Sequence, residues 1–254
     1  MKKFSKDFII KTWIPILILS ILLIYSRKGN NPFFPNPVEI IKTSFNLINY
    51  NWVSKNLLPS LISIIFGFML GSLLAITFGV TLTLNEKLRT LLMPNLNFLR
   101  SIPSVAKIPV VIAFFGIGLN SRIVSISLAA FFPVLLSTLN ALITTNKGYL
   151  ELAQISKLSH FQIFRYIKFP AGLNEIQIGL KVGLQISILI MITSEFIGAG
   201  FGVGAFIIHS QSTFKFIEMW QGVIIAGFLS IMLNNILDFI FKKIKNGYFI
   251  ESSI

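Results

Sequence analysis

The sequence contains no cysteine and only two histidines, and its nine acidic residues are outnumbered by 22 lysines and arginines. The absence of cysteine excludes disulfide bonds and thiolate metal sites. The histidines, His160 and His209, are far apart and neither has a neighbour at a metal-ligand spacing, so we expect no metal site. Charged residues make up only 12% of the 254 residues, whereas they make up about 25% of an average soluble domain.

Apolar residues take the place of the missing charge. Hydrophobic residues account for 54% of the chain, and 25 residues are phenylalanine. The net charge of +13 suggests a nucleic-acid partner, but a soluble nucleic-acid-binding protein carries more charge and less phenylalanine. About 20 apolar residues cross one bilayer. The sequence therefore predicts an all-α polytopic membrane protein with about six transmembrane helices, in a single domain over residues 1–254 with its core at about 57–245, and no nucleic-acid partner.

The apolar runs give approximate positions for these helices. The predicted helices cover about residues 9–25, 57–82, 103–117, 123–143, 176–197 and 220–241. The first run could be a signal peptide, but it ends in Tyr-Ser-Arg-Lys without a small-residue cleavage pattern, which favours a retained helix. The third run is short for a membrane span unless residues 99–102 extend it.

The lysines and arginines predict how these helices are oriented. With the N-terminus in the cytoplasm, six cations lie outside: Arg27, Lys28, Lys42, Lys55, Arg122 and Lys215. The other 16, including Arg100 and Lys107, then lie on the cytoplasmic side. Because short cytoplasmic loops of membrane proteins are enriched in lysine and arginine, we expect both termini and the segment 144–175 to be cytoplasmic.

A stripe of small residues runs along the second predicted helix. Gly67, Gly71, Ala75 and Gly79 recur at every fourth position, so they share one face of a helix. Small side chains on one face allow another helix to approach closely. The neighbour could be a helix of the same chain or a helix of a second copy.

Glu195 lies near the outer end of the fifth predicted helix, just before a glycine-rich run at residues 198–204. An intramembrane carboxylate normally faces protein or water and finds a partner. Glu195 could anchor the glycine run through hydrogen bonds, or it could lie on a transport pathway or gate. The glycine run follows a membrane helix rather than a strand, so we interpret it as a turn near the outer face and not as a dinucleotide-binding loop.

The polar segment between the fourth and fifth predicted helices contains an amphipathic stretch. Apolar residues recur there at 152, 155, 158, 161, 164 and 167, with polar residues between them. This near-helical spacing predicts short amphipathic helices, ended by Pro170. Their apolar face needs a cover, which could be the membrane lipid or a soluble partner protein.

This segment resembles the EAA loop of binding-protein-dependent ABC transporter permeases. The pattern of that loop is Glu-Ala-Ala, a glycine four residues after the second alanine, and Leu-Pro about thirteen residues later. Glu151 and Ala153 match the pattern, and Phe169-Pro170 stands at the Leu-Pro position. Leu152 replaces the first alanine, and Lys157 occupies the glycine position. If that position adopts a left-handed turn, a lysine there costs about 1 kcal/mol, and the turn could differ in this chain.

Further motifs resemble the nitrate/sulfonate/taurine group of these permeases. They are Phe-Pro-Asn-Pro at 34–37, the block at 94–118 that contains Leu-Arg-Ser-Ile-Pro and Phe-Gly-Ile-Gly, and Phe-Phe-Pro-Val-Leu-Leu at 131–136. The resemblance implies a permease subunit of an ATP-driven importer in the bacterial inner membrane. The implied cargo is a small oxyanion such as nitrate, a sulfonate or taurine, with a thiamine-precursor pyrimidine as the alternative.

The resemblance also implies partners and residue roles. Two permease copies would form the path, cytoplasmic ABC ATPase subunits would drive it, and a periplasmic substrate-binding protein would deliver the solute. ATP and Mg²⁺ would bind the ATPase, so we expect no cofactor and no enzymatic activity in this chain. The EAA-type loop, about 145–172, would dock the ATPase through Glu151, Leu152, Ala153, Lys157, Leu158 and Phe161. The pathway candidates are Ser104, Ser187, Thr193, Ser194 and Glu195.

Two other classes of membrane protein fit the sequence poorly. A secondary transporter is expected to show repeated halves and several membrane-embedded charges, and the sequence shows no repeat. A membrane enzyme needs a cluster of histidines or carboxylates at one interface, which the sequence also lacks. The chain has no Gly-x-x-x-x-Gly-Lys-Ser/Thr phosphate loop, so ATP would have to bind elsewhere.

Overall fold

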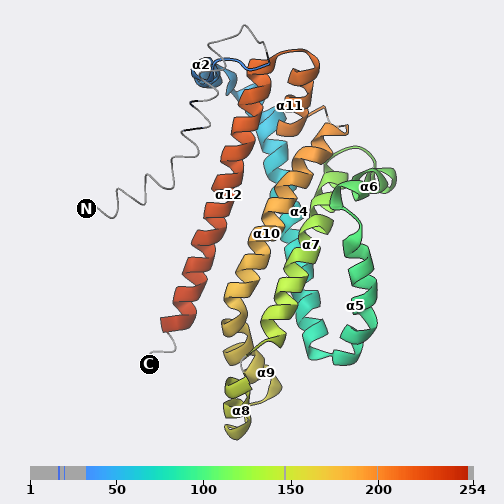
Figure 1. The fold of residues 1–254 in the computed structure, drawn as a ribbon, viewed down its shortest axis with the longest axis vertical. Helices are drawn as coiled ribbons and strands as arrows, with labels where there is room; N and C mark the ends of the chain where they lie inside the picture. Colours follow the sequence, from blue (N-terminus) through green and yellow to red (C-terminus); the bar gives the residue numbers. More distant parts are fainter. Residues whose placement is uncertain (1–16, 18–19, 21–32, 146, 199, 251–254) are drawn as a thin grey trace, which may run out of the picture.

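The computed structural model describes residues 17, 20, 33–145, 147–198 and 200–250 of the chain. The described residues form a bundle of long helices and contain no β-strand (Figure 1). The helices long and apolar enough to cross a membrane are Tyr50–Leu84, Leu119–Ile143, Phe161–Phe196 and Phe216–Asn246, and a bent pair can form a fifth span. The prediction of an all-α membrane protein is therefore confirmed. The predicted helix at 9–25 lies, apart from residues 17 and 20, outside the described residues.

Three long helices form the centre of the bundle. They are α4 (Leu58–Leu84), α7 (Leu119–Ile143) and α10 (Phe169–Phe196), which lie side by side in Figure 1. Fully buried aliphatic side chains such as Leu135 fill the space between them. We call the end of the bundle that carries α8 (Lys147–Ile155) and α9 (His160–Ile163) the loop end. We call the other end, which carries α11 (Val203–Ser212), the α11 end.

The stripe of small residues on α4 faces α7 of the same chain. A Cβ added to Gly67 would lie 2.7 Å from the Cβ of Ile126, and one added to Gly79 would lie 2.9 Å from the Cγ2 of Thr138. A Cβ on Gly71 would collide with the backbone oxygen of Ser127. The helices can approach this closely only because the stripe carries almost no side-chain volume, and Ala75 within it is also fully buried.

The third apolar run forms a helix, but a sharp bend separates it from the helix before it. Helix α5 (Glu86–Ser101) returns from the loop end, and the chain then bends by 90° into the short 3₁₀ helix η2 (Ser104–Lys107) and α6 (Ile108–Phe115). The bend follows from Pro103, because the residue before a proline disfavours the helical conformation, and Ile102 is indeed extended with ψ of 121°.

This bend corrects the predicted positions of two cations. Arg100 and Lys107 are predicted on the cytoplasmic side with the loop end. Instead, Arg100 lies at the far end of the 16-residue helix α5, about 24 Å along the helix axis from the turn that begins it. Lys107 follows the bend, and its Nζ lies 4.9 Å from the ring centre of Phe132, close to the midpoint of α7.

Pro170 lies within a continuous helical run instead of ending a helix. Helix α9 continues through the π-helical turn η3 (Phe164–Lys168) into α10, and Pro170 lies in the first turn of α10. Directly before it the hydrogen-bond pattern is π-helical, with the amide of Phe169 donating to the carbonyl oxygen of Phe164, so the proline, which has no amide hydrogen to donate, stands where the regular α-helical pattern is already interrupted. The fifth predicted helix therefore starts at Phe169, earlier than the predicted 176.

At the α11 end, short elements connect the first and last helices. Helix α2 (Pro37–Leu47) contacts α12 (Phe216–Ile250), and α3 (Tyr50–Trp52) with the π-helical turn η1 (Val53–Leu57) leads into α4. The amide of Gln221 on α12 donates a hydrogen bond of 2.7 Å to the hydroxyl of Thr43 on α2. Nearer the loop end, Lys181 on α10 forms an ion pair of 2.6 Å with Asp238 on α12.

Candidate functional site

The turn after α8 adopts the left-handed conformation although a lysine occupies it. Lys157 has a φ of 51°, and the next amide, that of Leu158, donates a 3.0 Å hydrogen bond to the carbonyl oxygen of Ala153. This bond is the one that a glycine usually makes possible at a helix C-terminus. The lysine costs about 1 kcal/mol relative to glycine, but the turn between α8 and α9 is formed.

The loop end exposes large apolar side chains. Ile155 is 79% exposed, Phe161 74% and Tyr166 70%. Of the predicted docking residues, Glu151 and Lys157 are exposed with Phe161, Leu158 is half-buried and Ala153 is buried; the side chain of Leu152 lies outside the part of the chain that the structure describes. The loop therefore offers an uncovered apolar surface with charged groups beside it.

At the α11 end, by contrast, Glu195 is only 1% exposed and its carboxylate has three partners. The hydroxyl of Ser60 donates a 2.6 Å hydrogen bond to Oε1, and the amide of Gly204 donates one of 2.7 Å to Oε2. Arg122 on α7 completes the set with an ion pair of 3.3 Å to Oε1. The carboxylate is thus held by groups from α4, α7 and α11.

Arg122 and Ser60 extend these contacts to the glycine-rich turn. Arg122 is 2% exposed, donates a 2.8 Å hydrogen bond to the carbonyl oxygen of Phe201, and stacks 4.1 Å from the centre of the Phe201 ring. The Ser60 hydroxyl also accepts a 2.9 Å hydrogen bond from the amide of Val203. We call Ser60, Arg122, Glu195 and the turn 201–204 the polar anchor.

Two glycines let the turn reach the carboxylate. Gly202 has a φ of +111°, and a Cβ added to it would lie 2.6 Å from Oε1 of Glu195. A Cβ on Gly204 would lie 2.6 Å from the carbonyl oxygen of Ile192. Each added carbon would therefore push the turn away from the carboxylate, so the glycine run serves close packing at this point.

Arg122 and Ser60 were not predicted as the partners of Glu195. Arg122 was counted only among the cations on the outer side, whereas its side chain is buried in the structure. A usable signal was present, because Arg122 stands at the start of the fourth apolar run and Glu195 at the end of the fifth. Neighbouring antiparallel helices bring such positions to the same level, and an intramembrane acid normally pairs with an available cation.

The other pathway candidates do not gather in one place. The hydroxyls of Thr193 and Ser194 donate to carbonyl oxygens one turn earlier in α10, to Leu189 at 2.7 Å and to Met191 at 2.8 Å. Ser187 is fully buried, and its hydroxyl has no hydrogen-bond partner among the described residues. Ser104 lies elsewhere, half-buried on η2.

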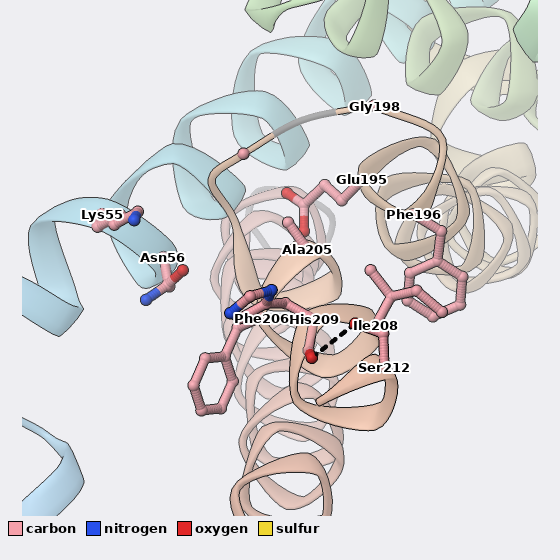
Figure 2. Close-up of a pocket in the computed structure, with 11 residues that line it drawn as sticks. Lys55, Asn56, Glu195, Phe196, Gly198, Ala205, Phe206, Ile208, His209 and Ser212 are labelled. Carbon is pink, nitrogen blue, oxygen red and sulfur yellow. Dashed lines mark hydrogen bonds between the residues drawn. The ribbon is translucent and has the colours of Figure 1, made fainter. Parts of the chain in front are cut away.

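A cleft of about 590 Å³ opens beside the polar anchor, between η1 and α11 (Figure 2). Its lining residues are Lys55, Asn56, Glu195, Phe196, Gly198, Gly200, Ala205, Phe206, Ile208, His209 and Ser212. Lys55 and His209 are exposed, and Asn56 is 7% exposed. Within the described part of the chain, no three histidine or acidic side chains lie close enough together to hold a metal ion. The cleft is large enough for a small solute, and both polar and aromatic side chains line it.

Residues 63–248 match the protein family described as "Binding-protein-dependent transport system inner membrane component". The chain belongs to this family. The prediction of a binding-protein-dependent permease is therefore confirmed, and the chain is a transport permease rather than a member of an enzyme family.

Similar proteins include permeases with named solutes. The permease is 27% identical over 240 residues to a protein of Bacillus subtilis (strain 168) named as an aliphatic sulfonates transport permease, SsuC, covering 92% of this chain and 87% of that protein. It is 25% identical over 236 residues to the nitrate import permease NrtB of Synechocystis sp., covering 89% and 85%. These names are consistent with the group suggested by the motifs.

A solved structure shows the same fold. An inward-facing structure of the MetNI methionine ABC transporter superposes with a TM-score of 0.53 at 24% identity, covering 78% of this permease and 94% of that chain. At this identity the likeness concerns the fold alone. It supports the arrangement of helices described above as a common bundle.

Proposed function

We propose that the permease is the membrane subunit of an ATP-driven importer that carries small oxyanions, of the sulfonate or nitrate class, across the bacterial inner membrane. Support comes from the family match over residues 63–248 and from relatives that are named for aliphatic sulfonates and for nitrate. A periplasmic binding protein would deliver the solute. Two copies of the permease would form the transport path at their interface.

The observation that carries this proposal is the uncovered loop end. Residues 147–168 form two short helices joined by the left-handed turn at Lys157, and they expose Phe161 and Tyr166. A soluble protein with a cleft for these helices would bury this apolar surface, which is favourable by about 25 cal/mol for each Å². We assign that role to an ABC ATPase, which would bind and hydrolyse ATP with Mg²⁺ outside this chain.

The charge distribution supports a cytoplasmic location for the docking loop. Lys147, Lys157, Arg165 and Lys168 lie at the loop end, and short cytoplasmic loops are enriched in such residues. Both termini would be cytoplasmic with it, and the α11 end would face the periplasm. With Arg122 in the polar anchor and with Arg100 and Lys107 away from the loop end, 14 of the cations predicted on the cytoplasmic side still compare with five predicted outside.

In the working transporter, closure of the ATPase pair would move the two docking loops together. The loop continues without a break through η3 into α10, so a displacement of the loop is passed to a membrane helix as a rigid unit. Such rigid-body movement of packed helices is a common way to alternate between two conformations. The polar anchor at the other end of α10 would hold that end fixed.

The experiment that tests docking is co-purification of the permease with its ATPase. We expect Glu151→Lys to insert into the membrane and to lose the ATPase, because Glu151 is exposed on α8 and would pair with a basic ATPase residue. Glu86→Lys is the matched control: Glu86 is also exposed at the start of a helix near the loop end, but it lies outside the docking loop. Normal co-purification of Glu151→Lys with the ATPase would contradict the assignment.

A further inference from the structure

Lys107 is a cation about half-way along α7, without an acidic partner within ion-pair distance among the described residues. Its Nζ lies over the ring of Phe132, near the midpoint of α7. The ion pairs among the described residues join Arg89 to Glu86, Arg122 to Glu195, Lys181 to Asp238 and Lys215 to Glu218. Lys107 takes part in none of them.

The side chain is also not enclosed by the bundle. Lys107 is half-buried, whereas the next residue, Ile108, is fully buried in the core. The neighbouring Val105 and Val110 are 42% and 57% exposed. The outer side of the bend is therefore not covered by other parts of the described chain. That side includes Ser104, because side chains three residues apart in a 3₁₀ helix lie above one another.

In a membrane, the free energy of the charged Lys107 side chain depends on whether this side of the bend faces lipid or water. An ammonium group that faces hydrocarbon at mid-membrane depth is strongly unfavourable, and charged residues in spans usually face a protein interior or a water-filled cavity. A snorkelling lysine avoids the cost near a helix end, but the position beside Phe132 is far from both ends of α7. A water-filled path along the bend would hydrate the ammonium group and so avoid the cost of placing it in hydrocarbon.

We infer that the side of η2 that carries Ser104 and Lys107 lines the transport path, and that Lys107 binds the anionic group of the solute as it crosses the middle of the membrane. This inference rests on the proposed function, and it adds to it a residue of the path that would bind the anionic group of the solute. A single lysine at this depth attracts an anion and repels inorganic cations. Its location opposite an aromatic ring also leaves apolar surface for a short alkyl chain, such as that of an aliphatic sulfonate.

The absence of cysteine from the chain makes a direct test possible. Ser104→Cys introduces the only thiol, one 3₁₀ turn from Lys107, in the full chain in lipid nanodiscs. The reaction rates of this thiol are measured with two membrane-impermeant methanethiosulfonates, one carrying an ethylsulfonate and one an ethyltrimethylammonium group. We expect the sulfonate reagent to react faster, and Lys107→Gln in the same background to lower the ratio of the two rates by about tenfold, as one unit charge nearby predicts.

Matched variants separate the possible results. Lys181→Gln removes a lysine that is paired with Asp238 and should leave the rate ratio unchanged. Ser156→Cys, exposed on the docking loop, shows that both reagents are active. If the thiol of Ser104→Cys reacts with neither reagent, position 104 faces lipid or a second copy and the inference is overturned; a rate ratio that Lys107→Gln does not change also overturns it. Because the test uses no ATPase, its failure is distinct from a failure of the docking experiment.

Discussion

The two ends of the bundle differ in which side chains they bury: charged side chains are buried at the α11 end, and large apolar side chains are exposed at the loop end. At the α11 end, Glu195 and Arg122 are buried and paired, and their further partners come from α4, α11 and the glycine-rich turn. At the loop end, Phe161 and Tyr166 are exposed, although such side chains normally contribute to a core. The two charges of the polar anchor are paired with each other within one chain, whereas the docking loop presents an apolar surface that the same chain does not cover.

This difference suits the α11 end to keep its helices in fixed positions and the loop end to be displaced by a partner. A buried ion pair restricts the helices that carry it, because any displacement leaves a charge unpaired in a low-dielectric environment. An exposed amphipathic loop has few internal contacts to lose and gains contacts from a partner. The following predictions test this contrast, in order of expected effect on the stability of the permease.

Removal of one partner from the polar anchor should have the largest effect. We expect Arg122→Leu to destabilise the permease by about 3–5 kcal/mol, since Glu195 is then left as a buried, unpaired charge. Thermal unfolding in detergent, with an unfolding free energy from denaturant titration, measures the loss. The double variant Arg122→Leu with Glu195→Leu should recover much of it, and Lys215→Leu, from an exposed pair, should change stability by less than about 1 kcal/mol. A loss equally small for Arg122→Leu would mean that the anchor does not hold the α11 end.

A methyl group in the glycine turn should have the next largest effect. Gly202→Ala places a Cβ against the Glu195 carboxylate at a φ of +111°, and we expect a loss of about 2 kcal/mol from backbone strain and the displaced carboxylate. The same measurement applies. Gly200→Ala is the control in the same turn, because a Cβ there meets no atom within 4 Å. Equal losses for both variants would show that the turn does not depend on contact with Glu195.

At the loop end, one substitution should stabilise the chain. Lys157→Gly removes the left-handed strain of a lysine at φ 51°, which is worth about 1 kcal/mol. The amide of Leu158, which donates to Ala153, should then exchange its hydrogen about fivefold more slowly, which hydrogen-exchange mass spectrometry or NMR can detect. Ser156→Gly, one residue earlier, should not slow this exchange. Unchanged protection at Leu158 would indicate that the turn is not strained by lysine.

The smallest effect on stability is expected from the exposed face of the docking loop. Phe161→Ser should change the unfolding free energy by less than about 0.5 kcal/mol, because the side chain is 74% exposed and loses few contacts. It should nevertheless weaken association with the ATPase in the co-purification assay. Leu135→Ala, in the core of α7, is the contrasting variant, with an expected loss of about 2–5 kcal/mol. A large loss of stability for Phe161→Ser would mean that the loop packs on its own chain.

Much of the helical framework could be predicted from local composition. Long apolar runs predict membrane helices at α4, α7, α10 and α12, since each run must satisfy its own backbone hydrogen bonds in lipid. The fourfold repeat of small residues predicts a close helix contact, and the structure shows that α7 supplies it. The spacing around Glu151 predicts short amphipathic helices, and α8 and α9 are present.

The errors concern positions where a proline acts together with the tertiary structure. The helix predicted from Pro103 is present as η2 and α6, but the 90° bend that separates it from α5 was not predicted. Pro170 is predicted at the end of a helix but lies in the first turn of α10. A proline is compatible with either side of a helix boundary. The sequence alone does not show which side packing favours, and the position of Lys107 beside Phe132, away from the loop end, depends on the bend.

Composition and short motifs in order were sufficient to establish that this protein is helical, lies in a membrane and resembles a binding-protein-dependent permease. Which groups meet is a property of the packed bundle. Ser60, Arg122 and Glu195 are separated by at least 60 residues along the chain, and their contact depends on how three helices pack. The same packing places Lys107 over the ring of Phe132, where no acidic side chain of the described chain lies within ion-pair distance.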